Sequence, residues 1–280
     1  MTLVFLSGIV DELSGLSTWL KLQVQVAAAS IIVVALGWSF ETVSIPGDGG
    51  IYLGPIVGSV STVVWIVGVI HAINWIDGMD GLAAGVTTII GASLGIFALA
   101  GNNAVSAIIC AAVVGAGLAF LRHNRAPARI LMGDSGSQVL GFLLAAASVH
   151  GSLKAPTAVA ILAPVLALGV PVIDTLLVML VRFLRRPKAP VATRLLGLLR
   201  ADHNHLHDRI EQSAPNRRSV VRAIYALVLA SCVLAFVVGS VGNEPLGWIV
   251  LLVEILAVVA VRSSLLGARP WVRRLLEAVA

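Results

Sequence analysis

Charged residues, cysteines and aromatic residues are all scarce in this sequence. Only 12% of the 280 residues are charged, two are cysteines and 5% are aromatic, whereas 58% are hydrophobic. The low charge and a mean hydropathy of +0.99 exclude an ordinary soluble domain. The two cysteines lie in apolar segments and predict no disulfide framework. Sparse aromatics also leave few surfaces on which bases could stack, so we expect no nucleic-acid partner. The sequence predicts an integral membrane protein.

Long apolar runs indicate about eight transmembrane helices within one domain, residues 1–280. The runs lie at 22–40, 51–73, 82–100, 104–121, 137–150, 156–181, 220–241 and 246–261. Each is rich in Val, Ala, Leu and Gly without alternating polarity, which favours an all-α polytopic bundle over a β-barrel. The opening MTLVFLSGIV is too short to span a bilayer and predicts a partial N-terminal helix.

The basic residues predict how the bundle is oriented. All of the 19 Lys and Arg except Lys154 fall in segments that, counting helices along the chain, share one side. The positive-inside rule makes that side cytoplasmic and predicts a multi-pass protein of the plasma (inner) membrane. Residues 182–219 are predicted to form a cytoplasmic loop rich in His and Arg. Residues 263–280 predict an interfacial amphipathic helix lying on membrane lipid, or equally a plain basic anchor.

Acidic residues gather at the same predicted face. The stretch NWIDGMDGL spaces Asn74, Asp77 and Asp80 by three residues, which places them on one side of a helix end. In LMGDSGSQVLG, Asp134 begins another helix at that face, where backbone N–H groups favour anions. Amide oxygens with carboxylates suit Mg²⁺, or Mn²⁺ in its place, better than zinc. The alternative for any single acid is an ordinary N-cap or a pairing with a nearby arginine.

Histidines alternate in RADHNHLHDRI, at His203, His205 and His207. The pattern fits a metal site, a clamp for phosphate and sugar, or a solvated loop. Lys21 and Arg209 add positive charge, as an anionic substrate requires. A divalent cation, carboxylates and basic side chains together favour phosphate chemistry. At a membrane interface, such chemistry would join a soluble phosphorylated donor to a lipid.

Four separated blocks resemble those of the polyprenyl-phosphate N-acetylhexosamine-1-phosphate transferases. The blocks are GIVDELSGLSTWLKLQVQ, HAINWIDGMDGLAAG, FLRHNRAPARILMGDSGSQVLG, and PVIDTLLVMLVR followed by ADHNHLHDRI. The resemblance covers nearly the whole chain. It implies a Mg²⁺-dependent transfer of sugar 1-phosphate from a UDP-N-acetylhexosamine to undecaprenyl phosphate, which releases UMP and starts cell-envelope polysaccharide synthesis. The His-x-His pattern resembles the UDP-GlcNAc type more than the phospho-MurNAc-pentapeptide type.

The resemblance also implies a role for each matching residue. The catalytic carboxylates would be Asp11, Glu12 and Asp77, with the first two near the lipid phosphate. Asn74 and Asp134 would hold the metal ion. The substrate-binding residues would be Lys21, Asp80, Asn124, His205, His207 and Arg209. Direct attack by the lipid phosphate is favoured over a covalent aspartyl intermediate.

The chain departs from the family pattern at several places. Glu12 replaces the second Asp of the acidic pair, His71 replaces an Asn, and Asp208 replaces a His. About two helices that the family carries before the acidic pair are absent, so a catalytically inactive truncated homologue is an alternative. A transporter is disfavoured because the acids lie at one interface and only Glu254 lies in the middle of an apolar run. Helix faces rich in Gly and Ala would permit a homodimer.

Overall fold

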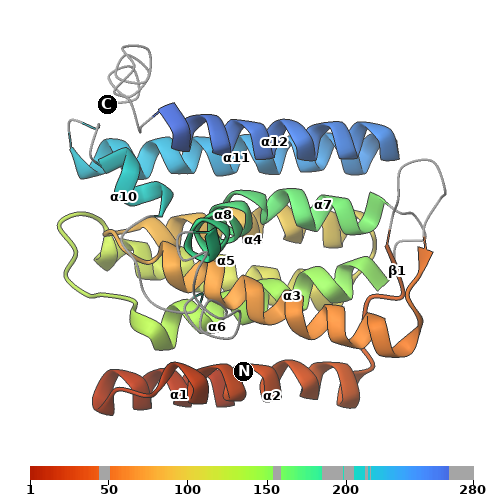
Figure 1. Ribbon diagram of the computed structural model, residues 1–280, viewed down its shortest axis with the longest axis horizontal. Coiled ribbons are helices and arrows are strands. Elements are labelled where there is room, and N and C mark those ends of the chain that lie inside the picture. The colour runs from red at the N-terminus through yellow and green to blue at the C-terminus, as the bar shows by residue number, and fades with distance from the viewer. Residues whose placement is uncertain are drawn as a thin grey trace.

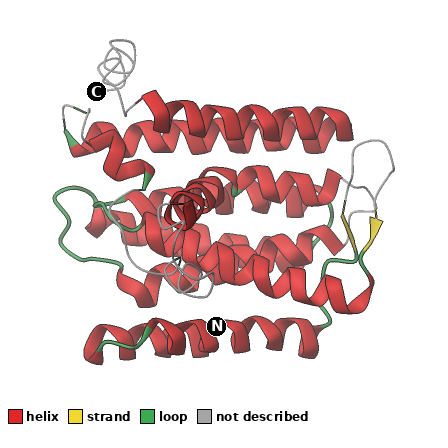
Figure 2. Cartoon of the chain, in the orientation of Figure 1, coloured by secondary structure: helices red, strands yellow, loops and turns green. Residues whose placement is uncertain are grey.

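The computed structural model is an almost entirely helical bundle (Figure 2). It describes residues 1–43, 51–153, 159–184, 198, 205–211, 214 and 216–264. The helices are α1 (Thr2–Ser14), α2 (Thr18–Leu36), α3 (Gly54–Ile76), α4 (Leu82–Ala100), α5 (Ala104–Asn124), α6 (Gly133–Leu153), α7 (Val159–Ala167), α8 (Gly169–Leu184), α10 (Leu206–Glu211), α11 (Arg217–Val241) and α12 (Glu244–Ser264). The predicted all-α class is confirmed. A two-stranded antiparallel hairpin, β1 (Thr42–Val43) and β2 (Ile51–Tyr52), was not predicted.

Among the described residues, six or seven helices qualify as candidate membrane spans, compared with the about eight that the sequence predicted. Within the described residues, six helices are long and apolar enough to cross a membrane, namely α2, α3, α4, α5, α11 and α12, and the bent pair α7 and α8 would make seven. The predicted span that does not qualify is 137–150, which corresponds to α6. That helix is 21 residues long, but its first turns carry the polar sequence GDSGSQ and its last turn contains His150. The protein is therefore a multi-pass membrane protein with six or seven candidate spans.

The predicted run 156–181 is divided between two helices, α7 and α8. The helix axis turns by 74° between α7 and α8. Pro171 explains the break, because a proline has no N–H to donate and its ring clashes with the carbonyl oxygen four residues earlier, that of Ala167. The α7 helix ends at that residue. As a result, the direction of α8 is not set by the helix before it.

The polar helix ends lie together at one end of the bundle. The α1–α2 turn, the α5–α6 loop, α10, the start of α11 and the end of α12 all lie toward the left of Figure 1, and the hairpin lies toward the right. This grouping agrees with the shared side that the basic residues predicted. Part of the predicted loop 182–219 lies outside the described residues, as do residues 265–280 of the predicted amphipathic helix.

Close helix contacts fix where α6 begins. A Cβ on Gly8 of α1 would overlap the backbone of Ser135, and a Cβ on Gly141 would lie 2.9 Å from the Cα of Ile70 in α3. Glycine at these two positions therefore lets α1 and α3 approach α6 closely from different sides. The first turn of α6, with Asp134, is held between them.

Candidate functional site

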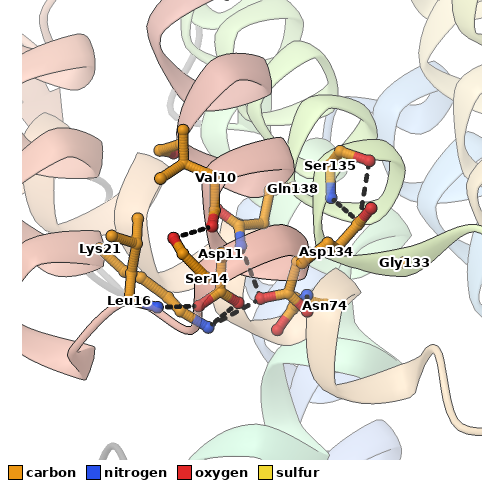
Figure 3. Close-up of polar contacts among 12 residues, drawn as sticks. Val10, Asp11, Ser14, Leu16, Lys21, Asn74, Gly133, Asp134, Ser135 and Gln138 are labelled. Carbon is orange, nitrogen blue, oxygen red and sulfur yellow. Dashed lines mark hydrogen bonds and ion pairs between the residues drawn. The ribbon is translucent and has the colours of Figure 1, made fainter.

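Asp134 is the centre of a polar network at this end of the bundle (Figure 3). Its Oδ1 accepts a hydrogen bond from Nδ2 of Asn74 at 3.0 Å. Its Oδ2 accepts from Nζ of Lys21 and from Nε2 of Gln138, each at 3.0 Å. Lys21 also forms an ion pair with Asp11. The network thus joins residues of α1, α2, α3 and α6 that lie far apart in the sequence.

The side chains of Ser137 and Gln25 fix the orientation of the amide groups of Asn74 and Gln138. Asn74 Nδ2 also donates to Oγ of Ser137 at 2.9 Å, so both of its hydrogens are used and Oδ1 remains as its acceptor. Gln138 in turn accepts from Nε2 of Gln25 at 3.1 Å. Both glutamines are almost fully buried, with 2% and 1% of their surface exposed. This chain of amides holds the Asp134 carboxylate through buried side chains of α2 and α6.

Glu12 contacts the first turn of α6. Its Oε1 accepts from both N and Oγ of Ser135, each at 2.9 Å, and a Cβ on Gly133 would overlap the same oxygen. Glu12 therefore occupies the place where an anion binds at a helix N-terminus. The extra methylene of Glu relative to Asp lets the carboxylate reach across from α1.

Asp77 is a half-buried acid next to the network. It ends α3 as the C-cap residue. Burial raises the pKa of Asp77 to about 7, the negative charge of Asp134 adds to this rise, and a hydrogen bond with the backbone of Gly133 opposes it. Two acids that repel each other in this way would be relieved by a cation between them.

The donor set fits a magnesium ion. Within the described residues there is no group of three or more His, Cys, Asp and Glu placed to hold a metal. The side chains at hand are the carboxylates of Asp134 and Asp77 and the amide oxygen of Asn74. Such a partial oxygen set suits Mg²⁺, which keeps several waters and takes phosphate oxygens from its substrate.

Because the pKa of Asp77 is raised in the folded protein, we expect the free energy of unfolding to depend on pH. Between the ordinary pKa of 3.8 and the folded value of about 7, the folded protein holds a proton that the unfolded chain has lost. The free energy of unfolding should therefore fall as pH rises through this window, by about 2 kcal/mol between pH 5 and 7. We expect the melting temperature in detergent without metal to drop by a few degrees over that range.

Asp77→Asn should flatten this dependence, because the amide does not titrate. Asp80→Asn, the same change three residues along, serves as the matched control and should keep the wild-type slope. Equal slopes in all three proteins would contradict the assignment.

Asp80 and Asn124 form a second, separate set of contacts. Asn124 is 3% exposed. Its Oδ1 accepts from the N–H of Gly81 at 2.9 Å, and its Nδ2 donates to the carbonyl of Ile130 at 2.8 Å. Asp80 Oδ2 accepts from the N–H of Ala128 at 2.9 Å. In this structure both side chains bind the protein's own backbone and hold the α5–α6 loop against the α3–α4 turn.

The histidine segment packs on the turn after α3. His207 lies over Gly78 so closely that a Cβ there would overlap its Nε2. The His205 ring stacks on the His207 ring at 5.9 Å and contacts the Trp75 ring at 5.4 Å. Burial lowers the pKa of His207. Arg209 lies in α10, half-buried, and His203 lies outside the described residues.

Comparison with known proteins supports the predicted family. Residues 1–152, more than half of the chain, match the family described as Glycosyl transferase family 4. The chain belongs to this family. It is 31% identical over 238 residues to the probable undecaprenyl-phosphate N-acetylglucosaminyl 1-phosphate transferase of Bacillus subtilis, which covers 85% of this chain and 64% of that protein.

Two further relatives are also similar to this chain. The decaprenyl-phosphate N-acetylglucosaminephosphotransferase of Mycolicibacterium smegmatis is 33% identical over 246 residues, which cover 81% of this chain and 58% of that protein. The phospho-N-acetylmuramoyl-pentapeptide-transferase of Lactiplantibacillus plantarum is 40% identical over 139 residues, or 48% of this chain and 42% of that protein. The chain thus spans less than two thirds of the length of these relatives.

Several polar residues of this family 4 chain were not assigned a role from the sequence. They are Gln25 and Gln138, described above, and Asp174 and Arg262, which pair inside the bundle. The sequence analysis named only Glu254 as an acid in the middle of an apolar run, but Asp174 lies in α8 and is also buried, with 7% of its surface exposed. A charged residue inside an apolar run was the signal that could have identified Asp174.

Proposed function

We propose that this chain transfers N-acetylhexosamine 1-phosphate, with GlcNAc 1-phosphate as the favoured group, from a UDP-sugar to undecaprenyl phosphate. One observation carries the proposal, the network in which Asp134 binds Asn74 of α3 and Lys21 of α2 at one end of the bundle. The printed names of the relatives describe the same class of transfer. The distribution of basic residues favours the cytoplasmic side for this end.

In the proposed reaction, an oxygen of the lipid phosphate attacks the β-phosphorus of the UDP-sugar. The bond from that phosphorus to the bridging oxygen breaks, and UMP leaves with the electron pair. Asn74, Asp134 and Asp77 would hold Mg²⁺, which when bound neutralises charge on the diphosphate. The lipid phosphate has a second pKa near 6 and is mostly ionised at neutral pH, so little depends on a general base.

The protein's own residues would position the two phosphates. Lys21 brings a positive charge to the site, and Asp11 beside it lies where the lipid phosphate is expected. Holding both phosphates in line accounts for much of the rate enhancement in such transfers. His205, His207 and Arg209 would contact the sugar and its phosphate from the other side of the turn after α3.

Release of UMP tests the proposal. Purified protein in detergent should release UMP from UDP-GlcNAc when undecaprenyl phosphate and Mg²⁺ are both present. Removal of the metal with EDTA should lower the rate by at least about 100-fold, because the diphosphate charge is then not neutralised. Binding of UDP-GlcNAc without any release would instead favour the catalytically inactive alternative.

The sugar is tested in the same assay. The match to the pentapeptide transferase of L. plantarum makes UDP-MurNAc-pentapeptide the second candidate donor. We expect UDP-GlcNAc to react faster, in keeping with the His-x-His pattern. Faster release from the MurNAc donor would overturn the assignment of the sugar and leave the class of reaction intact.

A further inference from the structure

Asp174 is a buried carboxylate held from two sides. Its Oδ1 accepts a hydrogen bond from Nη1 of Arg262 at 3.0 Å, and its Oδ2 lies 3.0 Å from Nδ1 of His205. All three residues are more than nine tenths buried, with exposures of 7%, 7% and 4% for Asp174, Arg262 and His205. The contacts join α8, the residue before α10, and the last turn of α12.

This arrangement determines which nitrogen of His205 carries a proton. A carboxylate paired with an arginine accepts hydrogen bonds and has none to donate, so Nδ1 of His205 must be the donor. In the neutral ring, Nε2 is then the acceptor, and in the charged ring it is a second donor. Nε2 is therefore the ring nitrogen that Asp174 does not occupy.

The ring of His205 is also held against the end of α3. It contacts Trp75, the residue after Asn74, and stacks on His207, which covers Gly78. The Trp75 ring also contacts the guanidinium of Arg182, whose central carbon lies 5.1 Å from the ring centre. His205 is thus held against the turn that carries the predicted metal and nucleotide residues.

The α12 helix contacts α8 at a second point. Glu254 precedes Arg262 by two helical turns on the same face of α12, with the fully buried Val258 between them. A Cβ on Gly169, the first residue of α8, would overlap the Glu254 carboxyl group. Because the chain bends by 74° before α8, these contacts from α12 set the position of α8 and of Asp174.

We propose that Arg262 and Asp174 are positioning residues for the transfer: they hold His205 with Nδ1 as donor and Nε2 toward the phosphates of the bound UDP-sugar. This inference rests on the proposed function. It extends the site to α8 and α12, beyond the residues 1–152 that match the family. Groups that orient a ligand in this way typically change activity by about 10- to 100-fold when removed.

Kinetics provide the first test. Arg262→Met should lower kcat by about 10- to 100-fold and change KM for the UDP-sugar much less, and Arg262→Lys should restore part of kcat. Arg217→Met is the matched control, because Arg217 also pairs with an acid near His205, Glu211 of α10, but on the exposed surface. Surface pairs contribute little, so this control should stay within about twofold of the wild type.

A spectroscopic test is independent of activity. The chain has six histidines, and ¹⁵N-histidine NMR distinguishes Nδ1–H from Nε2–H rings, with His205→Asn identifying the relevant signals. We expect an Nδ1–H ring at His205 that is lost in the double variant Asp174→Leu with Arg262→Met, which leaves no acceptor opposite Nδ1. Removing both charges together avoids leaving one of them buried alone, which protects the fold.

The two tests separate the possible failures. An unchanged His205 signal in the double variant would overturn the inference, as would kcat values equal to the wild type in Arg262→Met. A correct signal that is lost in the double variant, with no UMP release from the wild type, would support the positioning of His205 and overturn the proposed function instead.

Discussion

Replacing Asp134 by Asn should abolish UMP release almost completely, with a loss of about 10³-fold or more. Asp134 accepts hydrogen bonds from Asn74, Lys21 and Gln138. An amide oxygen could keep part of this geometry but carries no negative charge for a cation. Loss of one preorganised electrostatic contact costs about 10²–10³-fold, and loss of a metal ligand adds to that. The rate of UMP release at saturating substrates is the measurement.

Glu244→Gln is the matched control for this variant. Glu244 is the acidic residue in the first turn of α12, and α12 begins at the right of Figure 1, near the hairpin and away from the polar helix ends at the left. Both changes replace a carboxylate by an amide in the first turn of a helix. A similar loss in the two variants would mean that general damage to the membrane protein, and not chemistry at Asp134, explains the result. The melting temperatures of both variants should stay close to that of the wild type.

The fold class followed from composition, but the course of individual helices did not. Apolar runs identified every long helix because a spanning segment needs many apolar residues in succession. The same criterion included α6, whose polar first turns keep it from qualifying as a candidate span by composition. It also merged α7 with α8, because a hydropathy average does not respond to a single proline. Pro171 was in the sequence, and its backbone effect on Ala167 shows only when helix geometry is considered.

The site was predicted as a group of residues, and the partners within the group were not. Shared sidedness brought Asp11, Lys21, Asn74 and Asp134 to one end, and the structure joins them directly. Which oxygen meets which donor depends on how closely helices pack, as at Gly8, and no local pattern encodes that distance. For the same reason the contact of Glu12 with the start of α6 could not be predicted.

Pairs of charges inside the bundle were the most difficult to predict. Asp174 and Arg262 lie 88 residues apart in the sequence. Asp174 lies inside the predicted run 156–181, but Arg262 directly follows the run 246–261, where a charge is equally consistent with an exposed residue at the membrane surface. Only the bend before α8 and the antiparallel return of α12 bring them together. The position of Asp174 inside an apolar run could therefore have identified this acid from the sequence, and the structure was needed to identify its partner, Arg262.

Replacing Lys21 by Met should reduce kcat/KM for undecaprenyl phosphate by about 10²–10³-fold, which is the usual cost of one preorganised charge contact with a phosphate. In the structure, Lys21 bridges Asp11 and Asp134. A phosphate entering the site would form an ion pair with Lys21 in place of these carboxylates. Lys21→Arg should recover only part of the rate, because the planar guanidinium cannot reproduce a compact ammonium between two acids.

The response of this variant to Mg²⁺ separates phosphate binding from metal binding. Without Lys21, the carboxylate of Asp134 loses its nearest cation and lies beside the acid of Asp77, so a metal ion should stabilise the variant more than the wild type. We therefore expect a larger rise in melting temperature on addition of Mg²⁺ in Lys21→Met, despite its low activity. A smaller rise than in the wild type would mean that the ammonium helps to build the metal site, and the assignment of Lys21 to the phosphate would then be wrong.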